Sequence, residues 1–181
     1  MSYAIRPSSA WIWGADDGCR GYPLMVQQYP EIAGTVDDTV RKEGTAAHWV
    51  SHAIGQGYLV PEGTVSPEGV TVDDDMLDGV ALYLNVLRSW GGQVYQELPF
   101  PISGIHRLCG GTADACWWCP EQGLIRVADL KYGYRFVDEF ECLQGALYIL
   151  GFCEYLQARG LMVLDGHTEQ HLRFEFTIVQ P

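Results

Sequence analysis

The feature that most constrains the fold is a pair of runs rich in aromatic and β-branched residues, which flank the turn-forming segment Pro120-Glu121-Gln122-Gly123. This pattern predicts a β-hairpin. With those four residues as the loop, Cys119 faces Leu124, and the same register places Asp114 opposite Asp129. Cross-strand neighbours have Cβ atoms only about 4.5–5.5 Å apart, and like charges repel there. Two carboxylates held in this way require a cation, so the hairpin predicts a metal site.

A lysine accompanies the second carboxylate. Lys131 lies two residues beyond Asp129, and strand alternation places both side chains on the same face of the sheet. The hairpin therefore combines two carboxylates and an ammonium group at one place.

Several motifs, in this order along the chain, resemble the PD-(D/E)XK nuclease superfamily: Gly111-Thr112-Ala113-Asp114, Asp129-Leu130-Lys131 and Gln144-x-x-x-Tyr148. They resemble most closely its RecB-like branch. The sequences of residues 127–134 and 141–151 are similar to those of a phage and prophage group of RecB-like exonucleases.

The same resemblance extends to the N-terminal half of the chain. Glu43-Gly44-Thr45-Ala46-Ala47-His48 resembles the first motif of the RecB-like branch, whose histidine is a metal ligand. Pro7-Ser8-Ser9-Ala10 resembles the opening of those proteins. The resemblance therefore spans nearly the whole chain.

The resemblance implies a metal centre held by His48, Asp114, Asp129 and the backbone carbonyl of Leu130. Carboxylate oxygens suit Mg²⁺ or Mn²⁺, and a histidine shifts the preference toward Mn²⁺. One or two such ions would activate water and bind phosphate oxygen. Lys131 would orient or deprotonate the water and stabilise the developing charge, so Asp114, Asp129 and Lys131 are the implied catalytic residues.

Gln144 and Tyr148 are four residues apart on a predicted helix and share one face. The resemblance implies that they border the active site and bind substrate. The alternative is a core helix on which Tyr148 is half-buried with its hydroxyl in water. Glu43 is a weaker candidate, either near the metal or on the helix surface.

The order of predicted elements is typical of an α/β fold with a central mixed β-sheet flanked by helices, the restriction-endonuclease-like core of the resembling superfamily. At 181 residues the chain predicts a single domain, 1–181, with a loop-rich N-terminal arm of about residues 1–35. The elements after this arm are a helix over 37–54, a helix from 73, a strand over 94–102, the hairpin, a helix over 138–157 and a strand over 173–179.

Core positions follow from helical periodicity. The stripe expected on the helix from residue 73 is Leu77, Val80, Ala81, Leu84 and Leu87. On the helix from residue 138 it is Phe140, Leu143, Leu147 and Leu150. The triplet Asp73-Asp74-Asp75 is interpreted as a helix start rather than a metal site. Glu97 is interpreted as an exposed strand residue, with the metal centre as the alternative.

The formal net charge of −12 opposes a nuclease interpretation, because DNA-binding proteins usually present a basic surface. Either metal ions neutralise the carboxylates of the site and a small basic groove binds the DNA strand, or a partner protein or an oligomer presents the DNA. No apolar run approaches the ~20 residues of a membrane span, and no secretory signal is visible. These features predict a cytoplasmic protein, in a bacterium or a phage-infected host. Its six cysteines are expected as reduced thiols, without an iron–sulfur cluster.

The leading hypothesis is a metal-dependent DNA nuclease, an exonuclease of phage recombination or replication that leaves a 5′-phosphate and a 3′-hydroxyl. The alternative is a catalytically silent module on the same fold, which handles DNA or binds a recombination or replication protein. The weakest hypothesis is a structural metal protein that uses the cysteines. The sequence leaves several questions open: exonuclease or endonuclease action, the polarity of cleavage, single- or double-strand preference, RNA as a substrate, and the oligomeric state.

Overall fold

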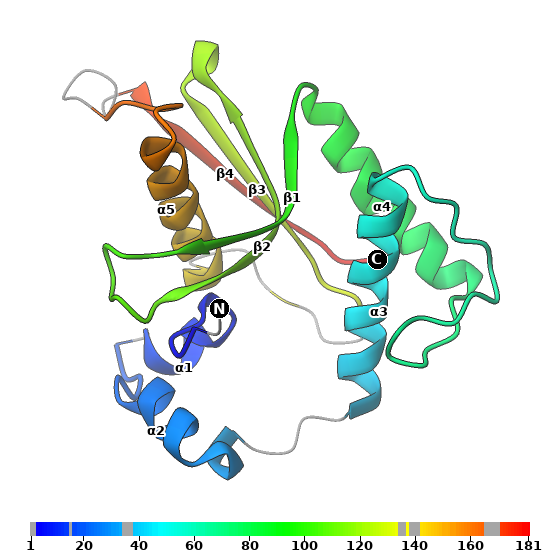
Figure 1. Ribbon diagram of the computed structural model, residues 1–181, viewed down its shortest axis with the longest axis horizontal. Coiled ribbons are helices and arrows are strands. Elements are labelled where there is room, and N and C mark those ends of the chain that lie inside the picture. Colours follow the sequence, from blue (N-terminus) through cyan, green and yellow to red (C-terminus); the bar gives the residue numbers. More distant parts are fainter. Residues whose placement is uncertain (1–2, 15, 34–37, 134–136, 138–141, 165–170) are drawn as a thin grey trace.

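The computed structural model describes residues 3–14, 16–33, 38–133, 137, 142–164 and 171–181. Its centre is a four-stranded sheet in the order β1 (Val94–Pro101), β2 (Gly110–Cys119), β3 (Leu124–Leu130) and β4 (Arg173–Val179). Strand β2 is antiparallel to both β1 and β3, whereas β4 runs parallel to β3. The predicted α/β fold with a mixed sheet flanked by helices is therefore confirmed (Figure 1).

The two faces of the sheet carry different helices. Helix α5 (Leu143–Ala158) packs on one face, and helices α3 (Asp38–Gly55) and α4 (Asp74–Trp90) lie together on the other side (Figure 1). Each face has its own apolar core. Val127 and Ile125 belong to the core under α5, whereas Ala128 and Leu130 belong to the core under α3 and α4.

The predicted hairpin is confirmed in its register. Cys119 pairs with Leu124, and the ladder continues to Ala115 opposite Ala128. The loop is a 3₁₀ turn over Pro120–Gln122, followed by Gly123 with φ of +57°. This left-handed conformation suits glycine, because a Cβ there would crowd the backbone.

Helix α5 differs from its predicted form. The described helix begins at Leu143, while the predicted start at Asp138 and the core residue Phe140 lie outside the described residues. Leu143 and Leu150 are exposed rather than buried. The helix instead presents Leu147, Tyr148, Phe152, Cys153 and Leu156 to the core, together with two glycines.

The glycines of α5 explain this orientation. A Cβ at Gly151 would come within 2.4 Å of Phe100, and one at Gly145 within 2.5 Å of Phe176. Both contacts are too close for any larger residue. The helix therefore turns its glycine side toward the sheet, which rotates two of the predicted leucines outward.

The N-terminal boundaries of α3 and α4 agree with prediction, within one residue. Asp73 caps α4, since its side chain accepts a hydrogen bond of 2.9 Å from the Met76 N–H. The predicted core stripe of α4 is partly wrong: Ala81 is exposed and Leu77 is half-buried, whereas Tyr83 is buried. The predicted core positions of α4 follow from its aliphatic residues alone, so they do not include Tyr83.

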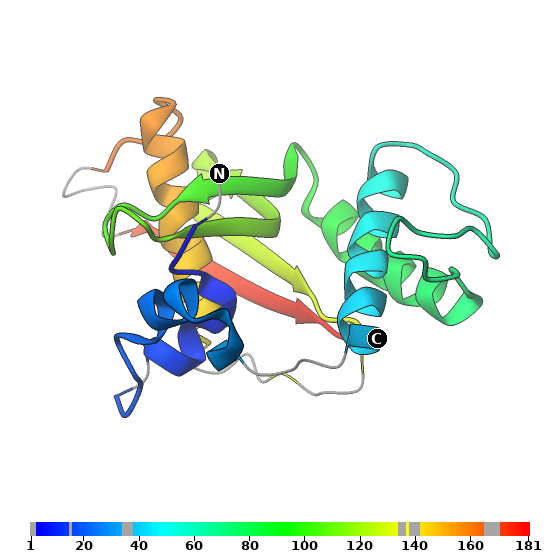
Figure 2. The ribbon, with the colours of Figure 1, turned by 60° about the horizontal axis from the view of Figure 1, so that its bottom comes forward.

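The N-terminal arm contains short helices, which the loop-rich prediction did not include. These are η1 (Pro7–Ser9), α1 (Ala10–Trp13), α2 (Tyr22–Gln28) and η2 (Pro30–Ala33). Trp13 and Ala10 pack in the core under α5, and the arm lies beside one end of that helix (Figure 2). Within the described residues, no helix is both long and apolar enough to span a membrane.

Candidate metal centre

The candidate site lies where strands β1 and β2 leave regular pairing. Pairs are formed on both sides, Gln96 with Ala115 and Leu98 with Ala113, but the intervening Glu97 and Asp114 do not form one. Glu97 has φ of +49°, which is sparsely populated for a residue with a side chain. Such a conformation costs about 1–3 kcal/mol and is often found at functional sites.

This irregularity changes which face the side chains occupy. In β2, both Cys116 and Ala113 belong to the core under α5, although strict alternation would separate them. Tyr95 and Leu98 in β1 show the same shift. The two strands therefore turn at Glu97 and Asp114, and both acids reach a position beside α3.

Helix α3 supplies the histidine of the site. His48 Nδ1 lies 3.5 Å from Glu97 Oε1 and 3.5 Å from Asp114 Oδ1. Among the described residues, these three side chains form one group whose ligand atoms all lie within 4.8 Å of one another. His48 and Asp114 are thus brought together as predicted. Glu97 joins them, and its predicted exposed position is wrong because its side chain is only 33% exposed.

The electrostatics of this cluster are strongly perturbed. Burial by itself lowers the pKa of His48, but the hydrogen bond to Glu97 and the charges of Asp114, Glu97 and Asp129 outweigh it and raise the pKa to about 9. Burial also raises the pKa of Asp114; Asp129 and Glu97 add to this, while His48 and the N–H of Leu130 oppose it. The cluster therefore holds more negative charge than its surroundings favour, which is the condition that a cation relieves.

Asp129 is almost fully buried, at 2% exposure, at the C-terminal end of β3. Its Oδ2 lies 2.7 Å from the Lys131 ammonium, so the predicted placement of these side chains on one face is confirmed. Burial raises the pKa of Asp129, and the positive charges of Lys131 and His48 oppose the shift. Asp129 thus has an ion pair of its own and does not belong to the three-residue cluster; its role as a ligand stays a prediction.

Leu130 connects the two carboxylates through its backbone. Its N–H donates a hydrogen bond of 2.7 Å to Asp114 Oδ2, just beyond the last regular pair of β2 and β3, Ala115 with Ala128. This bond leaves the other oxygen of Asp114 directed at His48. Whether the carbonyl of Leu130 is a ligand stays a prediction.

Helix α5 reaches the same site from the opposite face of the sheet. Gln144 Nε2 donates to Asp129 Oδ1 at 3.0 Å and to Tyr148 Oη at 3.3 Å. Tyr148 is buried, at 5% exposure, so the alternative of a half-buried tyrosine is wrong. Gln144 therefore orients a carboxylate directly, in addition to any contact with substrate.

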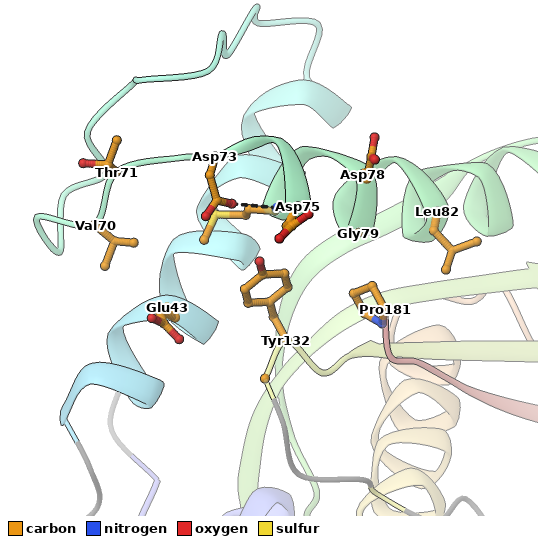
Figure 3. A pocket seen from close by; sticks show the side chains of 12 residues that line it. Glu43, Val70, Thr71, Asp73, Asp75, Asp78, Gly79, Leu82, Tyr132 and Pro181 are labelled. Carbon is orange, nitrogen blue, oxygen red and sulfur yellow. Dashed lines mark hydrogen bonds between the residues drawn. The ribbon is translucent and has the colours of Figure 1, made fainter.

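Glu43 lies elsewhere. It lines a separate pocket of about 610 Å³ between α3 and α4, with Asp73, Asp75, Asp78 and Tyr132 (Figure 3). Glu43 is five residues before His48 on α3, and this spacing directs the two side chains to different faces. It does not belong to the three-residue cluster.

The cysteines play no part in the cluster. All six are described and none forms a disulfide. Cys116 is buried in the core under α5, and burial raises the pKa of its thiol. Cys119 lies at the other end of the strand, where its Sγ is 3.3 Å from Glu121 Oε2. Cys116 and Cys119, although only three residues apart, therefore lie in different environments.

The donor set suits a divalent cation of the Mg²⁺ or Mn²⁺ class. Two carboxylates and one imidazole, partly shielded from water, match the oxygen and nitrogen ligands that Mn²⁺ accepts. Asp129 and Lys131 lie next to this group and can act on a bound phosphate or water. The arrangement has the elements of metal-assisted hydrolysis.

Comparison of the chain with models of protein families, with curated proteins and with solved structures gives no match. The resemblance to the PD-(D/E)XK superfamily therefore rests on the sequence motifs quoted above.

Proposed function

We propose that the protein is a metal-dependent DNA nuclease. The observation that carries this proposal is the proximity of His48, Glu97 and Asp114, next to the buried ion pair of Asp129 and Lys131. A structural ion pair alone would not require three further ionisable groups, and buried like charges are costly without a counter-charge. The exonuclease activity, and a role in phage recombination or replication, come from the motif resemblance.

His48, Glu97 and Asp114 would hold the cation, with Asp129 as a further candidate ligand. A bound Mg²⁺ or Mn²⁺ would supply a water of lowered pKa and would neutralise charge on the phosphate. His48 must lose its proton to act as a ligand, and its raised pKa shows that the proton is held tightly without a metal. Cation binding therefore competes with protonation of this residue.

Lys131 is the residue positioned to act on the reacting groups. Its side chain is 29% exposed and its ammonium lies 2.7 Å from Asp129 Oδ2, so this side chain borders both the buried carboxylate and solvent. In hydrolysis, a water oxygen bonds to phosphorus, the bond from phosphorus to O3′ breaks, and O3′ takes up a proton. Lys131 would orient the water and stabilise the charge on the phosphoryl oxygens. The products are a 5′-phosphate and a 3′-hydroxyl.

The charges around the site indicate from which side DNA approaches. The pocket at Glu43 is lined by carboxylates and would repel phosphate. On the other side, a pocket of about 340 Å³ contacts Tyr148 and is lined by Arg6, Ser8 and Thr112. We expect the DNA strand to enter there, past Tyr148. The affinity of the protein for DNA should be weak, because the chain carries a net charge of −12.

The second candidate is a catalytically silent module on the same fold, and the net charge of −12 favours it. Such a module would bind a DNA-handling partner or assemble into an oligomer that encloses DNA. Either function is compatible with a bacterial or phage-infected cytoplasm, which the motif resemblance suggests.

The test is incubation of the purified chain with end-labelled linear DNA and with closed circular DNA, with Mn²⁺ or with chelator. We expect degradation of linear DNA only, dependent on Mn²⁺ and absent in Lys131→Ala. Cleavage of circular DNA would identify an endonuclease instead. No cleavage of either form would favour the silent module and overturn the proposal.

A further inference from the structure

Tyr83 is a buried polar residue that the catalytic motifs do not explain. It lies in the middle of α4 and its side chain is 1% exposed. Within the described residues, its hydroxyl makes no hydrogen bond. A buried polar group without a partner is unfavourable, and such groups are rare in folded proteins.

The surroundings of Tyr83 make the hydroxyl harder to explain as packing. Tyr83 belongs to the hydrophobic core under α3 and α4, together with apolar residues such as Ala47 and Val50 of α3. Phenylalanine would fill the same space without a buried hydroxyl. Packing therefore accounts for the ring of Tyr83 but not for its oxygen.

Tyr83 lies in the core that adjoins the candidate metal centre. Ala47, Ala115 and Ala128 belong to the same core, and they are the chain neighbours of His48, Asp114 and Asp129. Burial raises the pKa of Tyr83 most strongly, and the charges of Asp114, Glu97 and Asp129 raise it further. Each of these carboxylates can accept a hydrogen bond but cannot donate one while ionised. The phenol consequently stays protonated, and its hydroxyl can donate one hydrogen bond and accept others.

We propose that Tyr83 is a positioning residue of the metal centre, whose hydroxyl hydrogen-bonds to the hydration shell of a cation held by His48, Glu97 and Asp114. Mg²⁺ keeps several waters when it binds to carboxylates. The hydrogens of such waters point away from the ion and need acceptors, which the phenol oxygen supplies. The phenol can in turn donate its own proton to a carboxylate oxygen.

This role complements that of Gln144. Gln144 supports the centre from α5, through Asp129, on one face of the sheet. Tyr83 would support it from α4, on the other face. Groups that hydrogen-bond to the ligands or waters of a metal typically alter its affinity by about 10–100-fold.

The inference rests on cation binding in the proposed function but not on nuclease activity. The experiment is calorimetric titration of the full chain with MnCl₂, together with thermal melting in chelator. The variants are Tyr83→Phe and, as matched control, Tyr95→Phe. Tyr95 packs under α5 against Phe152 and Tyr155, in the other core.

We expect Tyr83→Phe to weaken Mn²⁺ binding by about 10-fold, with an unchanged or higher melting temperature in chelator. The second result follows because the variant removes a buried hydroxyl that has no partner. Tyr95→Phe should leave Mn²⁺ affinity unchanged. A structural tyrosine would produce the opposite result, a lower melting temperature with unchanged affinity.

The outcomes separate this inference from the proposed function. If the wild-type chain binds no Mn²⁺, both are wrong. If the wild type binds and Tyr83→Phe binds equally well, only the role of Tyr83 is wrong. Equal weakening by Tyr83→Phe and Tyr95→Phe would also overturn it, because the loss would then be unspecific.

Discussion

Two acidic groups lie on different sides of α3, and only one has the properties of a metal centre. The three-residue cluster combines two carboxylates with His48, and Asp114 is nearly buried. The pocket at Glu43 contains more carboxylates, but its three aspartates are exposed (Figure 3). One of them, Asp73, already caps α4.

The comparison shows that the number of carboxylates does not define a cation site. Exposed acids are screened by water and can separate, so they bind cations weakly. Buried acids cannot relax, and their pKa values rise, as that of Asp114 does. Desolvation and a mixed ligand set, rather than charge density, distinguish the cluster from the pocket.

The largest expected effect concerns Lys131, with Lys42, the chain neighbour of Glu43, as its control. Lys131→Ala should reduce DNA cleavage by about 10²–10⁴-fold, the usual contribution of a positioned acid or base. Lys42→Ala, an exposed change on α3 next to Glu43, should leave the rate unchanged. Initial rates on end-labelled linear DNA with Mn²⁺ check this. Normal turnover in Lys131→Ala would remove the lysine from the proposed mechanism.

The next effect concerns metal-dependent stability. Mn²⁺ at 100 times its dissociation constant should stabilise the folded chain by about 2.7 kcal/mol, or roughly 5–10 °C in melting temperature for a protein of this size. Asp114→Asn should abolish this shift, whereas Asp78→Asn in the Glu43 pocket should retain it. Equal loss in both variants would mean that the two acidic groups do not differ.

The comparison also shows how far the sequence could predict the site. The register of the hairpin was predicted correctly, because a compact turn defines it locally. Asp114, Asp129 and Lys131 follow from that register. His48 was identified by its motif, although only the packing of α3 against the sheet brings it to Asp114.

The residues that sequence reasoning missed depend on irregular or tertiary structure. Glu97 reaches the cluster because it adopts positive φ where the strands turn, and no periodic pattern indicates that conformation. Tyr83 was missed because the core stripe of α4 was assigned from aliphatic residues alone, whereas the structure buries this aromatic ring with them. The contact of Gln144 with Asp129 joins α5 to β3, so only the assembled fold reveals it.

The stability of the metal-free chain should depend on pH in a direction that the cluster determines. The raised pKa of His48 stabilises the fold below about pH 6.5, and this contribution is lost as the pH rises through about 9. The raised pKa of Asp114 destabilises the fold progressively above about pH 4, where the unfolded chain ionises first. Both effects act together, so the melting temperature in chelator should fall from pH 5 to pH 9.

Thermal scans of the wild type and of Asp114→Asn check this pH dependence. The asparagine cannot ionise, and it also removes one charge that raises the pKa of His48. We therefore expect a flatter pH profile, with each kcal/mol worth about 2–4 °C. A wild-type melting temperature that rises toward pH 9 in chelator would contradict the assignment of the buried charges.

A smaller effect is expected from the amide that supports Asp129. Gln144→Ala removes the hydrogen bond to Asp129 Oδ1, so that this carboxylate is held by its ion pair with Lys131 but no longer oriented by the amide. We expect cleavage to fall by about 10–100-fold, with a reduced but detectable Mn²⁺ shift in melting temperature. Gln157→Ala, near the other end of α5, is the matched control and should behave like wild type. Complete loss of the Mn²⁺ shift would mean that Gln144 holds the cation more directly than we propose.

The smallest effect should come from Tyr148→Phe. This change keeps the ring that packs edge-on against Phe100 and removes only the hydroxyl that accepts from Gln144. One hydrogen bond contributes about 0.5–1.5 kcal/mol, equivalent to about 2–13-fold in rate or affinity. Because Gln144 keeps its bond to Asp129, the Mn²⁺ shift should not change. Parallel measurement of cleavage rate and Mn²⁺ shift separates the two roles: a loss in rate alone assigns the hydroxyl to substrate, whereas a loss in both would mean that it supports Asp129 through Gln144. If Tyr148→Phe cleaves DNA like the wild type, the DNA strand does not pass this tyrosine, and the proposed approach of DNA beside Arg6 is wrong.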